Sequence, residues 1–172
     1  MKLAKVFKEN KQFTLFSILA LVVVGVAVFA PQIAPYDPLD AVMLESLQAP
    51  SSAHPFGTDK LGRDLLSRVI FGTRTSLIMT LCLVAVIFVI GTFLGVIAGY
   101  FGGIVDGVIM RIADMMISFP GLVLAIAIAG MLGPNLVNAV ISIAAVSWTK
   151  YARLARSMVL RVKKNLYIEA AV

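Results

Sequence analysis

The side chains that usually carry chemistry are scarce in this sequence. It contains one histidine, His54, and one cysteine, Cys82, among 172 residues. Neither has a second histidine or cysteine nearby with which to bind a metal ion, and Cys82 lies in an apolar run, where we expect it to pack. The sequence shows no catalytic serine, histidine and aspartate set and no paired carboxylates. It therefore predicts no enzyme, no cofactor and no metal site, unless a catalytic part lies elsewhere.

The segment GTDKLGRD at 57–64 superficially resembles a phosphate-binding loop. Such a loop needs a lysine and then a serine or threonine after its second glycine, and here Arg63 and Asp64 stand in those positions. We interpret the segment as a turn that leads into a helix, with Thr58 or Asp59 as the N-cap and Asp64 on the exposed side. If ATP drives this protein, another subunit must bind the nucleotide.

The composition predicts a membrane protein. Hydrophobic residues make up 60% of the chain and charged residues 14%, whereas soluble domains have about 45–50% apolar and 25% charged residues. The net charge of +6 does not indicate a nucleic-acid partner, because ten of the fifteen cations lie in two blocks, 2–11 and 150–164. Each block flanks an apolar run, which is typical of segments that set membrane orientation.

The two cationic blocks predict the orientation of the chain. Short Lys/Arg-rich segments beside a span stay on the cytoplasmic side, so we expect both blocks inside and an even number of crossings between them. The first apolar run, residues 13–30, is longer than the 7–15 residues or so of a signal peptide. We therefore expect it to be retained as a span, with the N-terminus inside.

We expect an all-α membrane protein, a polytopic helical bundle with about four transmembrane helices. A span needs about 20 apolar residues. The expected segments are a cytoplasmic N-terminus (1–12), a first span (13–30), an extracytoplasmic loop with a short helix (31–74), a second span (75–100), a third span (107–132), a fourth span (135–149) and a cytoplasmic basic segment (150–172).

Three glycines in the second span recur at intervals of four: Gly91, Gly95 and Gly99. On a helix this spacing places them along one stripe, where small residues let the backbone of a neighbouring helix approach closely. The stripe predicts a packed bundle of helices in the membrane. It does not indicate what the bundle transports.

The third span carries charge and a helix breaker. Arg111 and Asp114 lie at i and i+3 and are able to pair, either as intramembrane functional groups or as a structural ion pair at the headgroup level. Pro120, after Phe119, should kink the helix. The charge-free run 115–149 fits either two spans or a re-entrant hairpin. An intramembrane enzyme would need acid and base groups clustered at the Arg111 and Asp114 pair.

Several blocks of the sequence form a pattern in the order in which they occur. They are APYDP at 34–38, HPFGTDKLGRDLLSR at 54–68, RIAD at 111–114 with Phe119 and Pro120, YARLAR at 151–156, and YIEAA at 167–171. Taken in this order, these blocks resemble the second permease subunit of bacterial peptide and nickel ABC importers. The second block and the last block are specific for this family when they occur together. The motif residues of the second block are Gly57, Thr58, Asp59, Gly62, Arg63 and Asp64.

The resemblance implies part of a six-helix type I importer permease in the cytoplasmic membrane of a prokaryote. Such a permease pairs with a homologous permease, two cytoplasmic ATPases and an external solute-binding protein, and ATP is bound only by the ATPases. In the family, a cytoplasmic helix that opens with Glu-Ala-Ala sits in a groove of the ATPase. Glu169, Ala170 and Ala171 match its beginning, and we expect the sequence to be truncated within this motif.

The function that the resemblance implies is import of di- or oligopeptides by alternating access. Two alternatives stay open. One is a permease for nickel or a metal chelate, because the external binding protein usually selects the solute. The other is a membrane anchor or assembly subunit that transports nothing.

Overall fold

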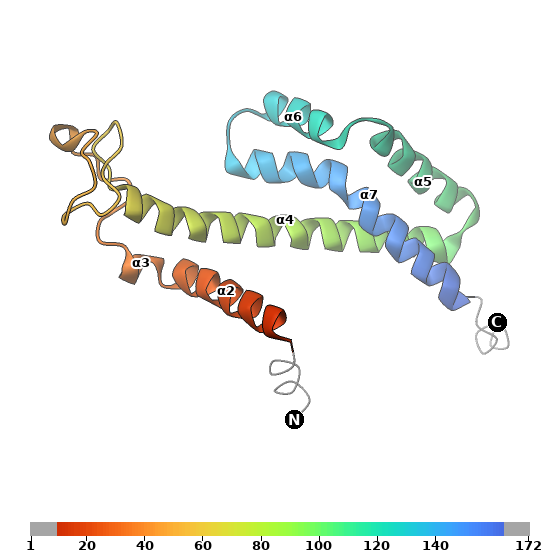
Figure 1. Ribbon diagram of the computed structural model, residues 1–172. Coiled ribbons are helices and arrows are strands. Elements are labelled where there is room, and N and C mark those ends of the chain that lie inside the picture. The colour runs from red at the N-terminus through yellow and green to blue at the C-terminus, as the bar shows by residue number, and fades with distance from the viewer. Residues whose placement is uncertain (1–9, 164–172) are drawn as a thin grey trace. The chain divides into compact units, whose positions relative to one another are not determined.

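The computed structural model describes residues 10–163 (Figure 1). They divide into two units. The first unit ends at Ile78 and the second begins at Met79, inside one long helix. Regular structure in residues 10–163 is helical, apart from one isolated bridge between Thr58 and Asp64. The expected all-α class is therefore confirmed.

The first unit begins with two helices, α2 (Lys11–Val28) and α3 (Ala30–Ile33). They are separated at Phe29, whose backbone N–H still donates to the Gly25 carbonyl at 2.9 Å. Proline lacks an N–H but is accepted in the first turn of a helix, and Pro31 occupies the first turn of α3. The expected first span therefore lies in α2 and the start of α3.

The longest helix, α4 (Leu65–Phe101), has 37 residues. At 1.5 Å per residue it is about 55 Å long, well beyond the hydrocarbon thickness of about 30 Å. We expected a short helix in the loop and a separate second span at 75–100. The structure joins the two, because no proline or glycine pair interrupts the sequence between Leu65 and Gly102.

In the second unit, α4 is followed by α5 (Gly103–Ser118), α6 (Gly121–Leu132) and α7 (Leu136–Lys163). The turn from α4 to α5 uses Gly102 and Gly103, which have positive φ angles of 66° and 50°, a region that glycine enters without a steric penalty. Helix α6 lies along the first part of α7, and α5 contacts α7 as well (Figure 1).

The helix break at Phe119 and Pro120 is sharper than the kink that we expected. Helices α5 and α6 are bent by 93° relative to each other. Phe119 has an extended backbone, with φ −91° and ψ 146°, as the residue before a proline prefers. The expected third span is therefore two helices, which together form either a broken span or a re-entrant loop.

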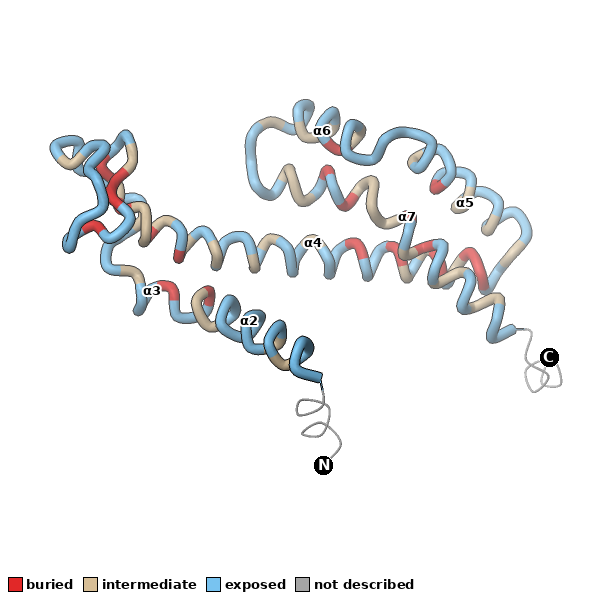
Figure 2. Tube along the Cα trace, viewed as in Figure 1, coloured by how far each residue is buried: buried red, intermediate tan, exposed pale blue. Residues whose placement is uncertain are grey.

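Within residues 10–163, two helices are long and apolar enough to cross a membrane, α2 and α4, and there are three candidates if α5 and α6 count as one span. The expected fourth span, 135–149, forms the first part of α7, which is not among these candidates because the helix runs on into its basic end. Most of the described helical surface is exposed (Figure 2), as expected for helices whose solvent is lipid.

Candidate functional site

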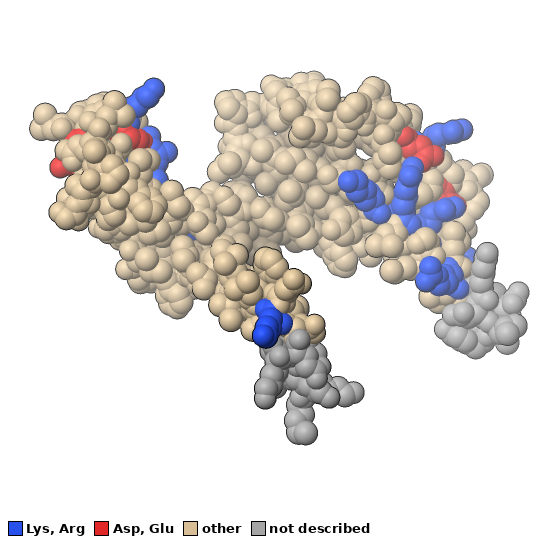
Figure 3. All heavy atoms as spheres, in the orientation of Figure 1, with Lys and Arg blue, Asp and Glu red and all other residues tan. Residues whose placement is uncertain are grey.

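The charged side chains of the described residues gather mainly in two places (Figure 3). One is the 34–64 loop of the first unit, which carries Asp59, Arg63 and Asp64. The other surrounds α5 and the second half of α7 in the second unit, where Asp106 and Arg156 pair. The site residues that we predicted from the sequence and that the structure describes lie in these two clusters or in the helix contacts near the second cluster.

Two glycines shape the 34–64 loop. Gly57 and Gly62 both have a φ of 74°, in the left-handed region where a side chain is strained. A Cβ atom at Gly57 would overlap the Gln48 carbonyl oxygen, and one at Gly62 would overlap the Val42 carbonyl oxygen. Glycine is therefore required at both positions by backbone conformation and by close packing.

Asp59 organises the turn between the two glycines. Its carboxylate accepts hydrogen bonds from the backbone N–H groups of Leu61 (2.8 Å) and Arg63 (3.1 Å) and from Arg63 Nε (2.9 Å). Arg68 also donates to it. The Arg63 side chain, more than any other group, holds the pKa of Asp59 well below its usual value, because these donors favour the charged carboxylate.

Asp64 is buried and caps α4, so our expectation of an exposed Asp64 and an N-cap at Thr58 or Asp59 was wrong. Its carboxylate accepts hydrogen bonds from the Ser67 backbone N–H and hydroxyl, both at 2.7 Å, and lies 3.0 Å from His54 Nδ1. Burial acts to raise the pKa of Asp64, but the donors from Ser67 and His54 outweigh it and lower the pKa.

His54 is buried between acidic side chains. Its Nε2 atom lies 3.4 Å from the Glu45 carboxylate, and its ring is 4.9 Å from the ring of Tyr36. Residues 10–163 contain no group of three or more metal-ligating side chains. Tyr36 also makes a contact that we did not predict: its backbone N–H donates a hydrogen bond to Ser67 Oγ at 3.0 Å. The cluster ties the proline-rich start of the loop to the first turn of α4.

The glycine stripe of α4 lies against α7. A Cβ atom at Gly91 would be 2.6 Å from the Trp148 carbonyl oxygen, and one at Gly99 would be 2.9 Å from the Val159 Cβ atom. A Cβ atom at Gly95 would overlap Ala152, which is fully buried. Helices α4 and α7 are thus in close contact at all three glycines of the stripe.

Two ion pairs connect α5 to α7. Arg156 donates to both oxygens of Asp106, each at 2.5 Å, and Arg153 pairs with Asp114. The i, i+3 spacing allowed Asp114 to pair with Arg111 on its own helix, but Asp114 pairs with Arg153, and Arg111 has no ion-pair partner within residues 10–163. Asp106 is not among the site residues that we predicted from the sequence, although acids are rare in this region.

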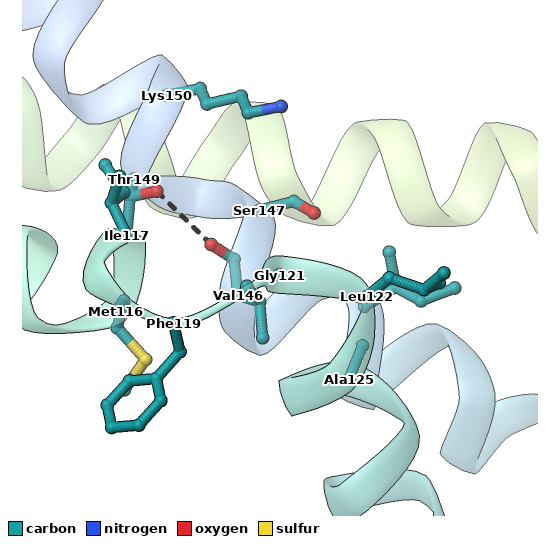
Figure 4. Close-up of a pocket in the computed structure, with 11 residues that line it drawn as sticks. Met116, Ile117, Phe119, Gly121, Leu122, Ala125, Val146, Ser147, Thr149 and Lys150 are labelled. Atoms are coloured by element: carbon teal, nitrogen blue, oxygen red, sulfur yellow. Dashed lines mark hydrogen bonds between the residues drawn. The ribbon is translucent and has the colours of Figure 1, made fainter.

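A cavity of about 350 Å³ lies beside the helix break (Figure 4). Phe119 and Gly121 from the break line one side, and Val146, Ser147 and Lys150 from α7 line the other. The lining is mostly apolar. At this cavity the helix break at Phe119 and Pro120 faces the first half of α7. From the sequence, we had predicted this break as a candidate transport path or interface.

The expected ATPase-coupling residues, Glu169, Ala170 and Ala171, lie outside the described residues. Helix α7 ends at Lys163, whose ammonium group donates to the Tyr100 carbonyl at the end of α4 (2.8 Å). The last described turn of α7 is therefore attached to α4, six residues before Glu169.

Two segments of the chain match known protein families. Residues 91–172 match the binding-protein-dependent transport system inner membrane component, and residues 2–50 match the N-terminal transmembrane domain of oligopeptide transport permease C. The chain belongs to this family of inner-membrane permeases. The first match covers the glycine stripe, the helix break and α7, and the second covers α2 and the start of the 34–64 loop.

Curated relatives extend the match over nearly the whole chain. A probable D,D-dipeptide transport system permease protein, DdpC of Escherichia coli, is 41% identical over 170 residues, which are 99% of this chain and 57% of the relative. The dipeptide permease DppC of Haemophilus influenzae is 37% identical over 96% of this chain and 58% of its own length. The glutathione permease GsiD of Pectobacterium atrosepticum is 42% identical over 88% of this chain and 50% of its own length.

The chain thus spans between half and three fifths of the length of these relatives. All three are named as permease proteins of transport systems for small peptides. The family resemblance inferred from the sequence motifs is confirmed.

Proposed function

We propose that this chain is part of the permease subunit of an ATP-driven importer for di- or oligopeptides. The relatives are named for dipeptides and for glutathione, itself a small peptide, which favours peptides over nickel. In this proposal a second permease, two cytoplasmic ATPases and an external solute-binding protein complete the transporter. ATP is bound by the ATPases, and this chain itself binds no cofactor.

The observation that carries the proposal is the course of α7. This helix has 28 residues, from Leu136 to Lys163; it lines the cavity at Ser147, and Lys163 lies only a few residues before Glu169. Along the way it packs on the glycine stripe of α4. A continuous helix moves as a rigid body, so a push at its cytoplasmic end reaches the helix break. Movement of this kind is what alternating access requires.

Glu169 provides the direct test. We expect the full-length permease with Glu169→Gln, reconstituted with its partners in liposomes, to bind the solute-binding protein normally. Its peptide-stimulated ATP turnover should fall about tenfold, the effect of losing one charged contact of 1.4 kcal/mol or more. Asp40→Asn is the matched control, because Asp40 is an exposed acid in the 34–64 loop. Undiminished stimulation in the Glu169 variant would remove the proposed coupling role.

The orientation of the chain is a separate part of the proposal. Both cationic blocks lie on the cytoplasmic side, and the 34–64 loop lies outside. A cysteine introduced near residue 165, after replacement of Cys82 by serine, should resist a membrane-impermeant thiol reagent in intact cells. A cysteine introduced at Asp40 should react. Rapid labelling near residue 165 from outside would show that the orientation is inverted.

A further inference from the structure

Helix α5 has little apolar contact with the rest of the second unit. Ile104 is 86% exposed, and Val108 and Met115 are each more than half exposed. Ala113 is the one buried residue of this helix. Since most of the apolar surface of α5 faces away from the other described helices, the two ion pairs to α7 are its main specific attachments.

The two ion pairs differ in burial. Asp106 and Arg156 form a bidentate pair in which the carboxylate is 17% exposed and the guanidinium 34% exposed. Bidentate arginine pairs are strong and fix geometry. Asp114 and Arg153 are 55% and 46% exposed, and pairs of this kind contribute less because water screens them. The first pair is therefore the principal one.

The positions of the pairs determine what they constrain. The acid nearer the start of α5 contacts the arginine farther along α7, and the later acid contacts the earlier arginine. The two helices therefore run in opposite directions at this contact. Two attachment points eight residues apart on α5 prevent it from pivoting about a single pair. The C-terminal end of α5 at Ser118 leads directly into the helix break at the cavity.

We propose that Asp106 and Asp114 are positioning residues, which make α5 move with α7 and so move the Phe119 side of the cavity during each transport cycle. The proposal rests on the proposed function and adds a second route from the ATPase to the cavity. The first route is α7 itself. The second is from Arg156 through α5 to the helix break.

Charge variants in the reconstituted full-length transporter test the proposal, with a dipeptide as the solute. Asp106→Asn and Arg156→Asp should each lower dipeptide-stimulated ATP turnover about fivefold or more, as expected from a coupling free energy of 1 kcal/mol or more. Basal ATP turnover should remain. The exchange of charges, Asp106→Arg with Arg156→Asp, should recover most of the stimulation. Asp114→Asn should have a smaller effect in the same direction.

Arg161→Asp is the matched control for Arg156→Asp. It makes the same change of charge on the same helix, at an exposed arginine without an ion-pair partner within residues 10–163. We expect it to leave the stimulation unchanged. An equal loss in the Arg161 and Arg156 variants would show a general effect of charge and would overturn the proposal.

A merely structural role gives a different result. If the pair only stabilised the fold, the variants would lower the amount of assembled transporter, and basal and stimulated turnover would fall together. That result would overturn the positioning role, as would failure of the charge exchange to restore stimulation in assembled transporter. Failure of the unaltered transporter to import the dipeptide would instead reject the proposed function.

Discussion

Replacement of Gly91 by alanine should force α4 and α7 apart. The added Cβ atom would lie 2.6 Å from the Trp148 carbonyl oxygen and equally close to the Tyr151 Cβ atom. Ordinary contacts of this kind begin at about 3.4 Å, so the helices would have to separate by about 0.8 Å. Neither contacting atom is the flexible end of a side chain, and the clash therefore cannot be relieved by a rotamer change.

The expected cost follows from two opposing effects. Overpacking of a close contact destabilises by about 1–3 kcal/mol, while alanine in place of glycine favours the helix by up to about 1 kcal/mol. With the full helix gain subtracted, the net loss should be up to about 2 kcal/mol, which lowers the folding equilibrium constant by a factor of up to roughly 30.

Reversible unfolding of the full-length permease in mixed detergent micelles, followed by circular dichroism, measures this loss. Trp148, the one tryptophan of the sequence, lies at the contact, and its fluorescence gives a local second signal. Gly72→Ala is the matched control in the same helix, because no atom lies within 4 Å of its added Cβ. It should be neutral or stabilising by up to about 1 kcal/mol. Equal stability of the two variants would refute the close contact of α4 with α7.

Three further results are expected. Gly62→Ala should destabilise the 34–64 loop by at least about 1 kcal/mol, since its φ is 74° and the Val42 oxygen occupies the space; faster proteolytic cleavage of the loop measures this. The depressed pKa of Asp64 means that its contribution to stability is complete above the ordinary value of 3.8 and is lost as the pH falls below it; proteolysis against pH should show this dependence in the unaltered protein and not in Asp64→Asn. Asn138→Ala should cost about 1 kcal/mol by removing the hydrogen bond to the Leu132 carbonyl, as micelle unfolding would reveal; an unchanged midpoint would contradict it.

Local patterns predicted the helices better than their ends. Composition gave the membrane class, and apolar runs located α2 and the body of α4. The run 115–149 was ambiguous, because hydropathy alone does not distinguish two crossings from a broken span or a re-entrant loop. Pro120 marked the place of the break, but the 93° angle depends on how α6 packs along α7, which no local pattern contains.

For the candidate site residues too, local sequence did not predict which partners they contact. Asp64 was expected on the surface, since a single acid before a helix usually faces water. Its burial requires His54 and Ser67 to supply donors from both sides, and only the folded loop brings them together. Likewise, Asp114 had a neighbour at i−3, Arg111, but the structure joins it to Arg153 on another helix.

The sequence by itself determined that this protein lies in a membrane and which family it belongs to. The apolar runs and the family motifs that show this are both properties of local residue order. It also marked Gly91, Gly95 and Gly99 as a contact surface. Only the tertiary structure decided that α7 fills that surface and that Asp106 pairs with Arg156. Those partners are about 50 residues or more away along the chain, and the choice among distant partners is made by packing in three dimensions.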